Sequence, residues 1–251
     1  MNKIASFTTL VVAAAITFIS CKKDEKVTPQ RQFFGAEQKL GDGTARSFVK
    51  LDESGKPEVV GISISEKAMN SLPHDMTFLV LPVPAEAGQT QFKYVGLDYM
   101  PHGHEPAQVY DKPHFDVHFY KVTPDVVKAM GPQDPKLNAL PDAAFLPADY
   151  ISTGSVPQMG HHWIDKTSPE LAGKPFEQTL IYGSYDSKVI FIEPMITTEF
   201  MKKGGTSQFA IKQPQKYATT GLYPTAYTIR YDAGTKEYLV ELGKFENKQV
   251  N

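Results

Sequence analysis

Runs of alternating apolar and polar residues recur along the chain and predict short β-strands joined by turns. Residues 46–51 alternate, residues 52–57 are rich in turn formers, and residues 58–62 return as a second apolar run, which is the pattern of a hairpin. We expect further strands over residues 77–83, 91–99, 114–121, 179–182, 188–192, 227–231 and 237–242. The run 77–83 is apolar enough to predict a strand buried on both faces.

Three short helices are expected among these strands. Ser65, Thr123 and Thr197 each precede a helical run and carry a side chain that can cap it. The expected helices cover residues 66–72, residues 124–130, and a third segment that ends at the glycine pair 204–205. The predicted fold is therefore mainly β with a few short helices (α+β), built on a β-sandwich or barrel-like core.

The first twenty residues have the order of parts typical of a secretory signal. Lys3 supplies a positive start, and residues 5–19 are uncharged and too short to span a bilayer as a helix. A small residue then precedes Cys21, as in the lipobox of bacterial lipoproteins. We therefore predict a lipoprotein signal peptide over residues 1–20 and lipidation of Cys21, which would attach the chain to a membrane.

The segment after Cys21 is polar and charged. Residues 21–35 are predicted to form a tether, and residues 36–251 a single β-rich domain. Lys22 stands where inner-membrane lipoproteins carry aspartate, so we expect an outer-membrane lipoprotein. The Lys-Asp-Glu run that follows keeps exposure on the outer surface open.

Composition narrows the classes of function. Loss of residues 1–20, which contain Lys3 and no acid, would change the net charge from −2 to −3, and no basic cluster suits nucleic acid. Cys21 is the only cysteine, so an internal disulfide is excluded, as is a cysteine nucleophile if Cys21 carries lipid. The sequence shows no Ser-His-Asp pattern, so it gives no support for a hydrolase that works without metal.

Six of the seven histidines fall into three short groups, at residues 102 and 104, 114 and 118, and 161 and 162. In the strand predicted at 114–121, His114, Asp116 and His118 share one face, and the aromatic and aliphatic residues between them share the other. Neutral imidazole is a common metal ligand, so this face predicts a metal site. The alternative is a structural network of hydrogen-bonded polar side chains.

The spacing of His114 and His118 limits how they could bind an ion. Four residues of strand span about 13 Å, which is too far for two ligands of one ion at ~2 Å each. A straight strand favours Asp116 with one histidine, whereas a bulge near Pro113 would bring His114 closer. Whether His114 and His118 share an ion stays open from the sequence. Gly103 should let the backbone bend so that the rings of His102 and His104 converge.

Two further residue types bear on the site. Glu193 follows an apolar strand, and a buried carboxylate there would need a cation or hydrogen-bond donors. Met100, Met159 and Met195 lie near the histidines in sequence and leave copper open, although methionine more often fills core space. Mixed nitrogen and oxygen donors suit a divalent transition metal, with zinc favoured and copper or iron as alternatives.

Several motifs together resemble the TTHB210-like (DUF5602) family of bacterial proteins. They are the segments 103–106, 113–120, 159–163 and 191–197, with Tyr110. The resemblance runs from about Gly41 to Phe200. It implies a β-rich fold and, for the namesake, a homo-oligomeric ring, but no established reaction. The positions that match the family pattern are His104, His114, His118, His162 and Glu193, with His102 and His161 as optional neighbours.

Three functions follow from this sequence. The first is a lipid-anchored envelope protein with a His/Glu metal site, with or without catalysis by a metal-activated water or dioxygen. The second is a non-enzymatic oligomeric structural or stress-associated protein whose histidines form a hydrogen-bonded core. The third is a module that binds sugars or peptides through Trp163 and nearby tyrosines.

Overall fold

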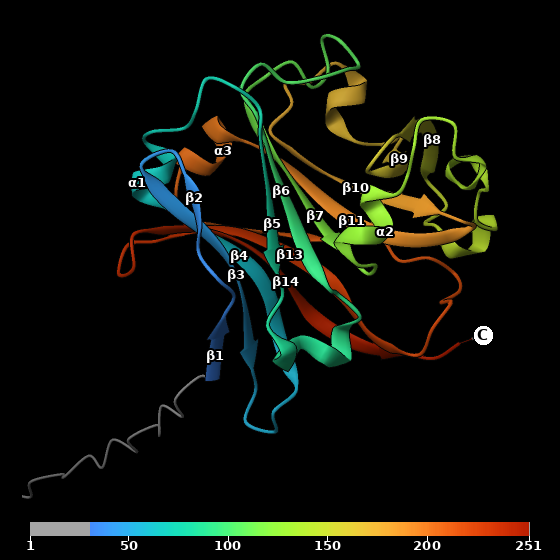
Figure 1. Cartoon of the computed structure of the whole chain (residues 1–251), viewed down its shortest axis with the longest axis horizontal. Coiled ribbons are helices and arrows are strands. Elements are labelled where there is room, and N and C mark those ends of the chain that lie inside the picture. Colours follow the sequence, from blue (N-terminus) through green and yellow to red (C-terminus); the bar gives the residue numbers. More distant parts are fainter. Residues whose placement is uncertain (1–30, 251) are drawn as a thin grey trace, which may run out of the picture.

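The computed structural model describes residues 31–250, which form two antiparallel β-sheets packed face to face (Figure 1). The predicted signal peptide and Cys21 lie outside the described residues. Each sheet has seven strands, and every strand pairing is antiparallel. Both sheets are open, so the sandwich form of the predicted fold is the one observed.

The first sheet combines the start and the end of the described chain. Its order is β1-β3-β4-β14-β13-β12, and β2 also pairs with β3. The strands are β1 (Arg31–Phe34), β2 (Gln38–Leu40), β3 (Gly43–Leu51), β4 (Pro57–Ser65), β12 (Thr206–Ala210), β13 (Gly221–Asp232) and β14 (Glu237–Lys248). The predicted β3-β4 hairpin is therefore confirmed. The strands predicted over 227–231 and 237–242 lie within β13 and β14, which pair with each other. β1 lies within the range predicted as tether.

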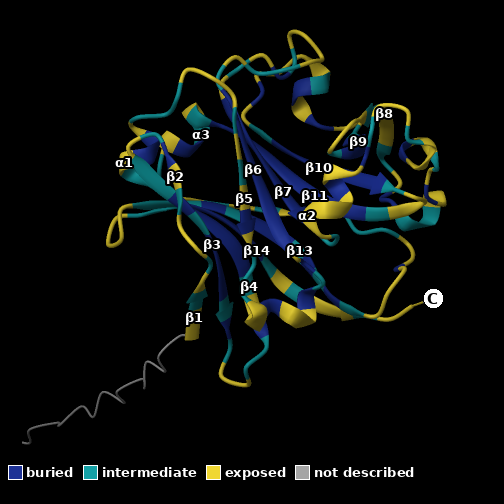
Figure 2. Cartoon of the chain, viewed as in Figure 1, coloured by how far each residue is buried: buried dark blue, intermediate teal, exposed yellow. Residues whose placement is uncertain are grey.

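The second sheet is formed by the middle of the chain and has the order β5-β6-β7-β11-β10-β9-β8. Its strands are β5 (Thr77–Pro82), β6 (Tyr94–Met100), β7 (His114–Tyr120), β8 (Tyr150–Val156), β9 (Gly160–Asp165), β10 (Gln178–Tyr185) and β11 (Lys188–Thr197). The central strands β6, β7 and β11 are buried along most of their length (Figure 2). Because both faces of these strands are buried, other segments of the chain must cover the face that points away from the first sheet.

The main core lies between the sheets and is built by alternate residues of both. Ile62 and Val240 of the first sheet and Val117 and Phe119 of the second are fully buried in one apolar cluster. Complete burial of such side chains contributes about 1.5–3 kcal/mol each. Because the apolar face of β7 points into this core, its other face must carry the polar residues.

Short helices connect the strands. They are α1 (Glu66–Met69), α2 (Pro124–Lys128), α3 (Thr198–Lys202) and the 3-10 helices η1 (Ala85–Thr90), η2 (Pro135–Asn138), η3 (Ala143–Phe145) and η4 (Pro169–Ala172). The predicted caps are confirmed at two of three sites. Ser65 Oγ accepts a hydrogen bond from Ala68 N at 3.2 Å, and Thr197 Oγ1 accepts one from Phe200 N at 3.1 Å. Thr123 precedes α2 but makes no side-chain capping bond.

The strand predicted over residues 77–83 is observed, but its predicted burial is wrong. β5 is not buried on both faces, because Phe78 and Val80 are 56% and 45% exposed. β5 is an edge strand of the second sheet, and an apolar run alone does not reveal a place at an edge. Among residues 31–250, no helix has the length and apolar character needed to cross a membrane.

Candidate metal centre

The polar face of β7 is as buried as its apolar face. Phe115 and Val117 are fully buried in the main core, as the alternation predicted. On the opposite face, His114, Asp116 and His118 are only 0%, 2% and 1% exposed. The strand therefore holds two imidazoles and a carboxylate out of water, where each polar atom needs a partner.

Two small apolar clusters and the connecting segments cover this outer face. Near one end of β7, Tyr110 from the β6–β7 connection packs edge-on against Phe176 at a ring-centroid distance of 5.0 Å, and Phe176 packs against His114 at 5.4 Å. At the other end, Val127 of α2 lies in a cluster with Phe191 of β11, and α2 crosses in front of β11 in Figure 1. The polar side chains lie between these two apolar clusters.

The first group of potential ligands consists of His104, His114 and Asp116. Asp116 Oδ1 lies 3.0 Å from His114 Nε2, and Asp116 Oδ2 lies 3.4 Å from His104 Nε2. The Nδ1 atoms of His104 and His114 are each 2.7 Å from a backbone carbonyl, of Glu105 and Lys112 respectively. If Nδ1 carries the proton that these carbonyls accept, the Nε2 lone pairs face Asp116, as in many metal sites.

Gly103 places His104 in this group. Its φ is +70°, and a Cβ at this position would overlap the carbonyl oxygen of Tyr110. The backbone bend predicted at this glycine is confirmed, but it brings in His104 alone. His102 is exposed and belongs to neither ligand group, so the prediction that both rings converge is wrong.

The second group consists of His118, His162 and Glu193, from β7, β9 and β11. Glu193 Oε2 lies 3.3 Å from His118 Nε2 and 3.8 Å from His162 Nε2. His118 Nδ1 lies 3.3 Å from Asp98 Oδ2, so the ring is held between two carboxylates. A carboxylate behind a ligating imidazole is a recurrent outer-shell feature of metal sites.

Aromatic rings fix the imidazoles of the second group. Tyr120 stacks on His118 at 5.4 Å, and Phe191 packs edge-on against both His118 and His162 at 4.9 and 5.4 Å. Gly183 makes room for Phe191, because a Cβ there would overlap the phenyl ring. The backbone and ring packing thus hold both imidazoles in place.

The structure brings together all five predicted ligands but divides them between two groups. His114 and His118 fall in different groups, as the strand spacing favoured, and Asp116 pairs with His114. A single site formed by all five residues is therefore not what the structure shows. Asp116 completes the first group, although the family resemblance did not include it.

Three of the four separations between facing nitrogen and oxygen atoms fit a bound ion, and the separation of His162 from Glu193 is wider. With metal–ligand bonds of ~2.1 Å, two neighbouring ligand atoms lie about 3.0 Å apart in octahedral and about 3.4 Å apart in tetrahedral geometry. The observed N–O separations are 3.0 and 3.4 Å in the first group and 3.3 and 3.8 Å in the second. His114 Nε2, Asp116 Oδ1, His118 Nε2 and Glu193 Oε2 are nevertheless buried and make no hydrogen bond. One ion in each group would satisfy all four atoms.

The cluster has no lysine or arginine to balance its carboxylates. Among residues 31–250, the ion pairs of Asp98, Asp116 and Glu193 are with histidines only. Burial opposes protonation of His118, but the charges of Glu193 and Asp98 outweigh it and raise its pKa to about 9. Compensation must therefore come from protons on imidazoles or from a metal cation.

Burial and neighbouring charges also shift the pKa values of the other ionisable groups in the cluster. Burial lowers the pKa of His104, but its contact with Asp116 outweighs this and raises it to about 9. Burial raises the pKa of Glu193 to about 8 even though His118 opposes the shift. Burial, together with the charge of His118, lowers the pKa of His162 to about 3. His162 is thus a neutral ring that can offer a lone pair at any physiological pH.

The remaining histidines and methionines lie outside the ligand groups. His161 points away and lies 2.7 and 2.8 Å from the hydroxyls of Ser152 and Ser155. His74 is exposed. Met195 is fully buried in the apolar cluster of Tyr110 and Phe176, which is the packing role expected of most methionines.

Asp98 is the residue that sequence reasoning missed. It lies on β6 directly opposite Asp116 and is 7% exposed. Burial raises its pKa. Its signal was available, because Asp98, like Glu193, is an acid in an otherwise apolar strand.

Comparison with known proteins gives one match. The family model described as "TTHB210-like: Hypothetical protein TTHB210" matches residues 52–99, which span β4, α1, β5 and nearly all of β6. The match includes Asp98 but ends before the five predicted ligands. Searches of curated proteins and of solved structures found no match. The resemblance to the TTHB210-like family is thus confirmed for residues 52–99.

Proposed function

We propose that this protein binds divalent transition-metal ions, zinc above all, with one ion in each of the two histidine–carboxylate groups. The observation that carries the proposal is the pair of buried triads whose facing nitrogen and oxygen atoms lie at ligand separations without hydrogen bonds. Each triad supplies two imidazoles and one carboxylate. This donor set suits zinc, and it also suits iron(II) and copper(II).

Three protein ligands leave a coordination position on each ion for a water molecule. Sites of this kind can be catalytic, because a bound metal lowers the pKa of its water and polarises substrates. His104 is 35% exposed and Asp116 is 3% exposed at their side chains, so the first triad borders solvent on the His104 side. Any reaction would take place there rather than at the second triad, whose His118 and His162 side chains are only 1% and 13% exposed.

We also propose that the protein acts in the cell envelope, anchored to the outer membrane by lipid on Cys21. Support comes from the signal-like residues 1–20, the single cysteine and Lys22 after it. The anchor is tested by a Cys21→Ser variant, which should move from the membrane pellet to the soluble fraction after cell lysis. A variant that stays in the pellet would refute the anchor and leave the metal proposal intact. A homo-oligomeric ring, as in the family's namesake, is tested by the mass of the protein in solution.

A second candidate is a structural role without metal. The raised pKa values of His104 and His118 favour it, because protonated imidazoles at neutral pH could balance Asp116 and Glu193 directly. This network would need no ion, but it leaves the buried His162 Nδ1 without a hydrogen bond.

Zinc titration of the chain from Lys22 onward separates the candidates. The metal proposal predicts two equivalents for the unsubstituted protein and one each for His114→Ala and His118→Ala, because each variant opens a different triad. His74→Ala is the matched control and should retain two, since His74 is exposed and belongs to neither group. Less than a tenth of an equivalent after incubation with zinc or copper would reject metal binding in favour of the ion-paired network.

A further inference from the structure

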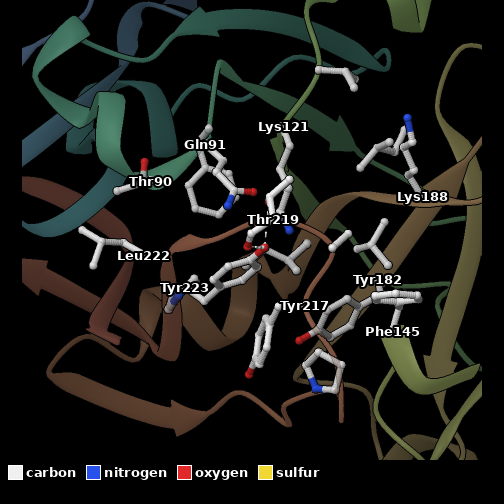
Figure 3. A pocket seen from close by; sticks show the side chains of 18 of the residues that line it. Thr90, Gln91, Lys121, Phe145, Tyr182, Lys188, Tyr217, Thr219, Leu222 and Tyr223 are labelled. Carbon is white, nitrogen blue, oxygen red and sulfur yellow. Dashed lines mark hydrogen bonds between the residues drawn. The ribbon is translucent and has the colours of Figure 1, made fainter. Parts of the chain in front are cut away.

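A second potential binding site lies at one end of the core between the sheets. It is a cavity of about 460 Å³ (Figure 3). Its lining includes the end of η1 and the residues that follow it, the residues after β7, the first part of β11, and the segment 213–224. Phe92, Tyr182 and Ile192 in its wall belong to the main core. No residue of either triad lines it. Its volume is in the range of sites for small organic ligands.

The charges around this cavity are of one sign. Four lysines line it, at positions 93, 121, 188 and 216, and no aspartate or glutamate does. The whole chain has a net charge of −2, so this separation is local. A concave site with only positive charges attracts anions.

Lys121 is the lysine most enclosed by the cavity. Its side chain points into the space in Figure 3, and its Nζ lies 4.8 Å from the centre of the Tyr223 ring. Among residues 31–250 no carboxylate lies within ion-pair distance of this ammonium. Burial lowers the pKa of Lys121 to about 8. An enclosed ammonium without a counter-ion is costly, and a bound anion would remove that cost.

Gln91 offers a second unused donor. Its Nε2 is buried and has no hydrogen-bond partner. Gln91 follows the last residue of η1 and has a φ of +67°, a backbone conformation that residues other than glycine rarely adopt. The Gln91 amide and the Lys121 amine both lie in the cavity shown in Figure 3.

We propose that this cavity binds a small amphipathic carboxylate, with its two oxygens between Lys121 Nζ and Gln91 Nε2 and its apolar body against the ring walls. Tyr217, Tyr223 and Leu222 supply much of that wall. One ammonium and one amide donor match a monoanion with two acceptor oxygens. A phosphate dianion would need more donors than these two, and the other three lysines of the cavity are exposed to solvent.

Calorimetric titration of the chain from Lys22 onward tests this with two pairs of probes. Octanoate is compared with 1-octanol, and 3-phenylpropanoate with 3-phenylpropanol, so that each pair differs only in the charged head. We expect each acid to bind with a stoichiometry of one molecule per chain. Its affinity should be at least about tenfold higher than that of the matching alcohol, because the alcohol cannot form the charge-assisted hydrogen bond. Equal affinity for acid and alcohol, or saturable binding of neither acid, would overturn the proposal.

Variants locate the binding. Lys121→Met should weaken the acid about tenfold and leave the alcohol unchanged, and it should fold, because it replaces a costly charge with an apolar chain of similar length. Lys128→Met is the matched control, since Lys128 is exposed on α2 and does not line the cavity. Unchanged acid affinity in Lys121→Met would overturn the proposal, as would inorganic phosphate binding as tightly as the acids.

Discussion

Asp98 offers the sharpest test of how the second triad holds an ion, because it contacts a ligand without being one. Its Oδ2 lies 3.3 Å from His118 Nδ1, on the side of the ring away from Glu193. Asp98→Asn keeps the size of the side chain and an acceptor oxygen but removes the charge that raises the basicity of His118. The perturbation therefore reaches the ion only through the imidazole.

The expected size of the effect follows from this position. Outer-shell carboxylates of this kind typically change metal affinity by about 10- to 100-fold, or about 1.4–2.7 kcal/mol. We place Asp98→Asn toward the lower end, because the asparagine oxygen can still accept the Nδ1 proton and hold the ring. The first triad should be unaffected, since its imidazoles donate to backbone carbonyls instead.

Competition with a chromophoric zinc chelator measures this loss. The assay is carried out on a His114→Ala background, so that only the second triad reports. Asp75→Asn on the same background is the control, because Asp75 is exposed and pairs with no histidine of the cluster. Zinc affinity that is equal in Asp98→Asn and Asp75→Asn would show that His118 does not bind the ion in the orientation described.

Three further predictions concern stability. Gly183→Ala should lower the unfolding free energy by about 1–3 kcal/mol and weaken zinc binding at the second triad, because the new methyl displaces Phe191 from His118; chemical denaturation that matches the unsubstituted protein would contradict this. Zinc at 100 times its Kd should raise stability by about 2.7 kcal/mol per site, a rise in Tm of about 5–10 °C that a chelator reverses; scanning calorimetry with no change would contradict it. Lys121 has a folded-state pKa of about 8, below the ordinary value of 10.5, so the unfolded chain binds the extra proton and stability should rise between pH 8 and 10.5 relative to Lys121→Met. Parallel pH profiles of the two proteins would contradict that assignment.

Local patterns predicted much of the fold. The alternation in residues 114–120 correctly assigned one face of β7 to the core, and the turn-forming residues after Leu51 correctly placed the β3-β4 hairpin. The sequence did not predict β8 and β9, because neither shows strong alternation; β9 is placed by pairing with β10, and β8 by pairing with β9. It also misjudged β5, because exposure at a sheet edge depends on which strands are its neighbours.

The candidate site was predicted in its members but not in its arrangement. Histidine grouping indicated the region, and the family resemblance selected five residues, all of which the structure places in the two triads. Their division into two triads depends on which strands lie next to β7, and local sequence patterns do not predict the order of strands in a sheet. Burial of this face likewise depends on the contact of Tyr110 with Phe176. Tyr110 was among the motif residues, but no motif indicated Phe176.

Anomalous diffraction at the zinc absorption edge, from crystals grown with zinc, tests the central claim most directly. The account predicts two peaks in each chain. One should lie between His104, His114 and Asp116, and the other between His118, His162 and Glu193. Crystals with no anomalous peak within bonding distance of these six side chains would contradict the claim that the buried histidine–carboxylate groups are metal sites.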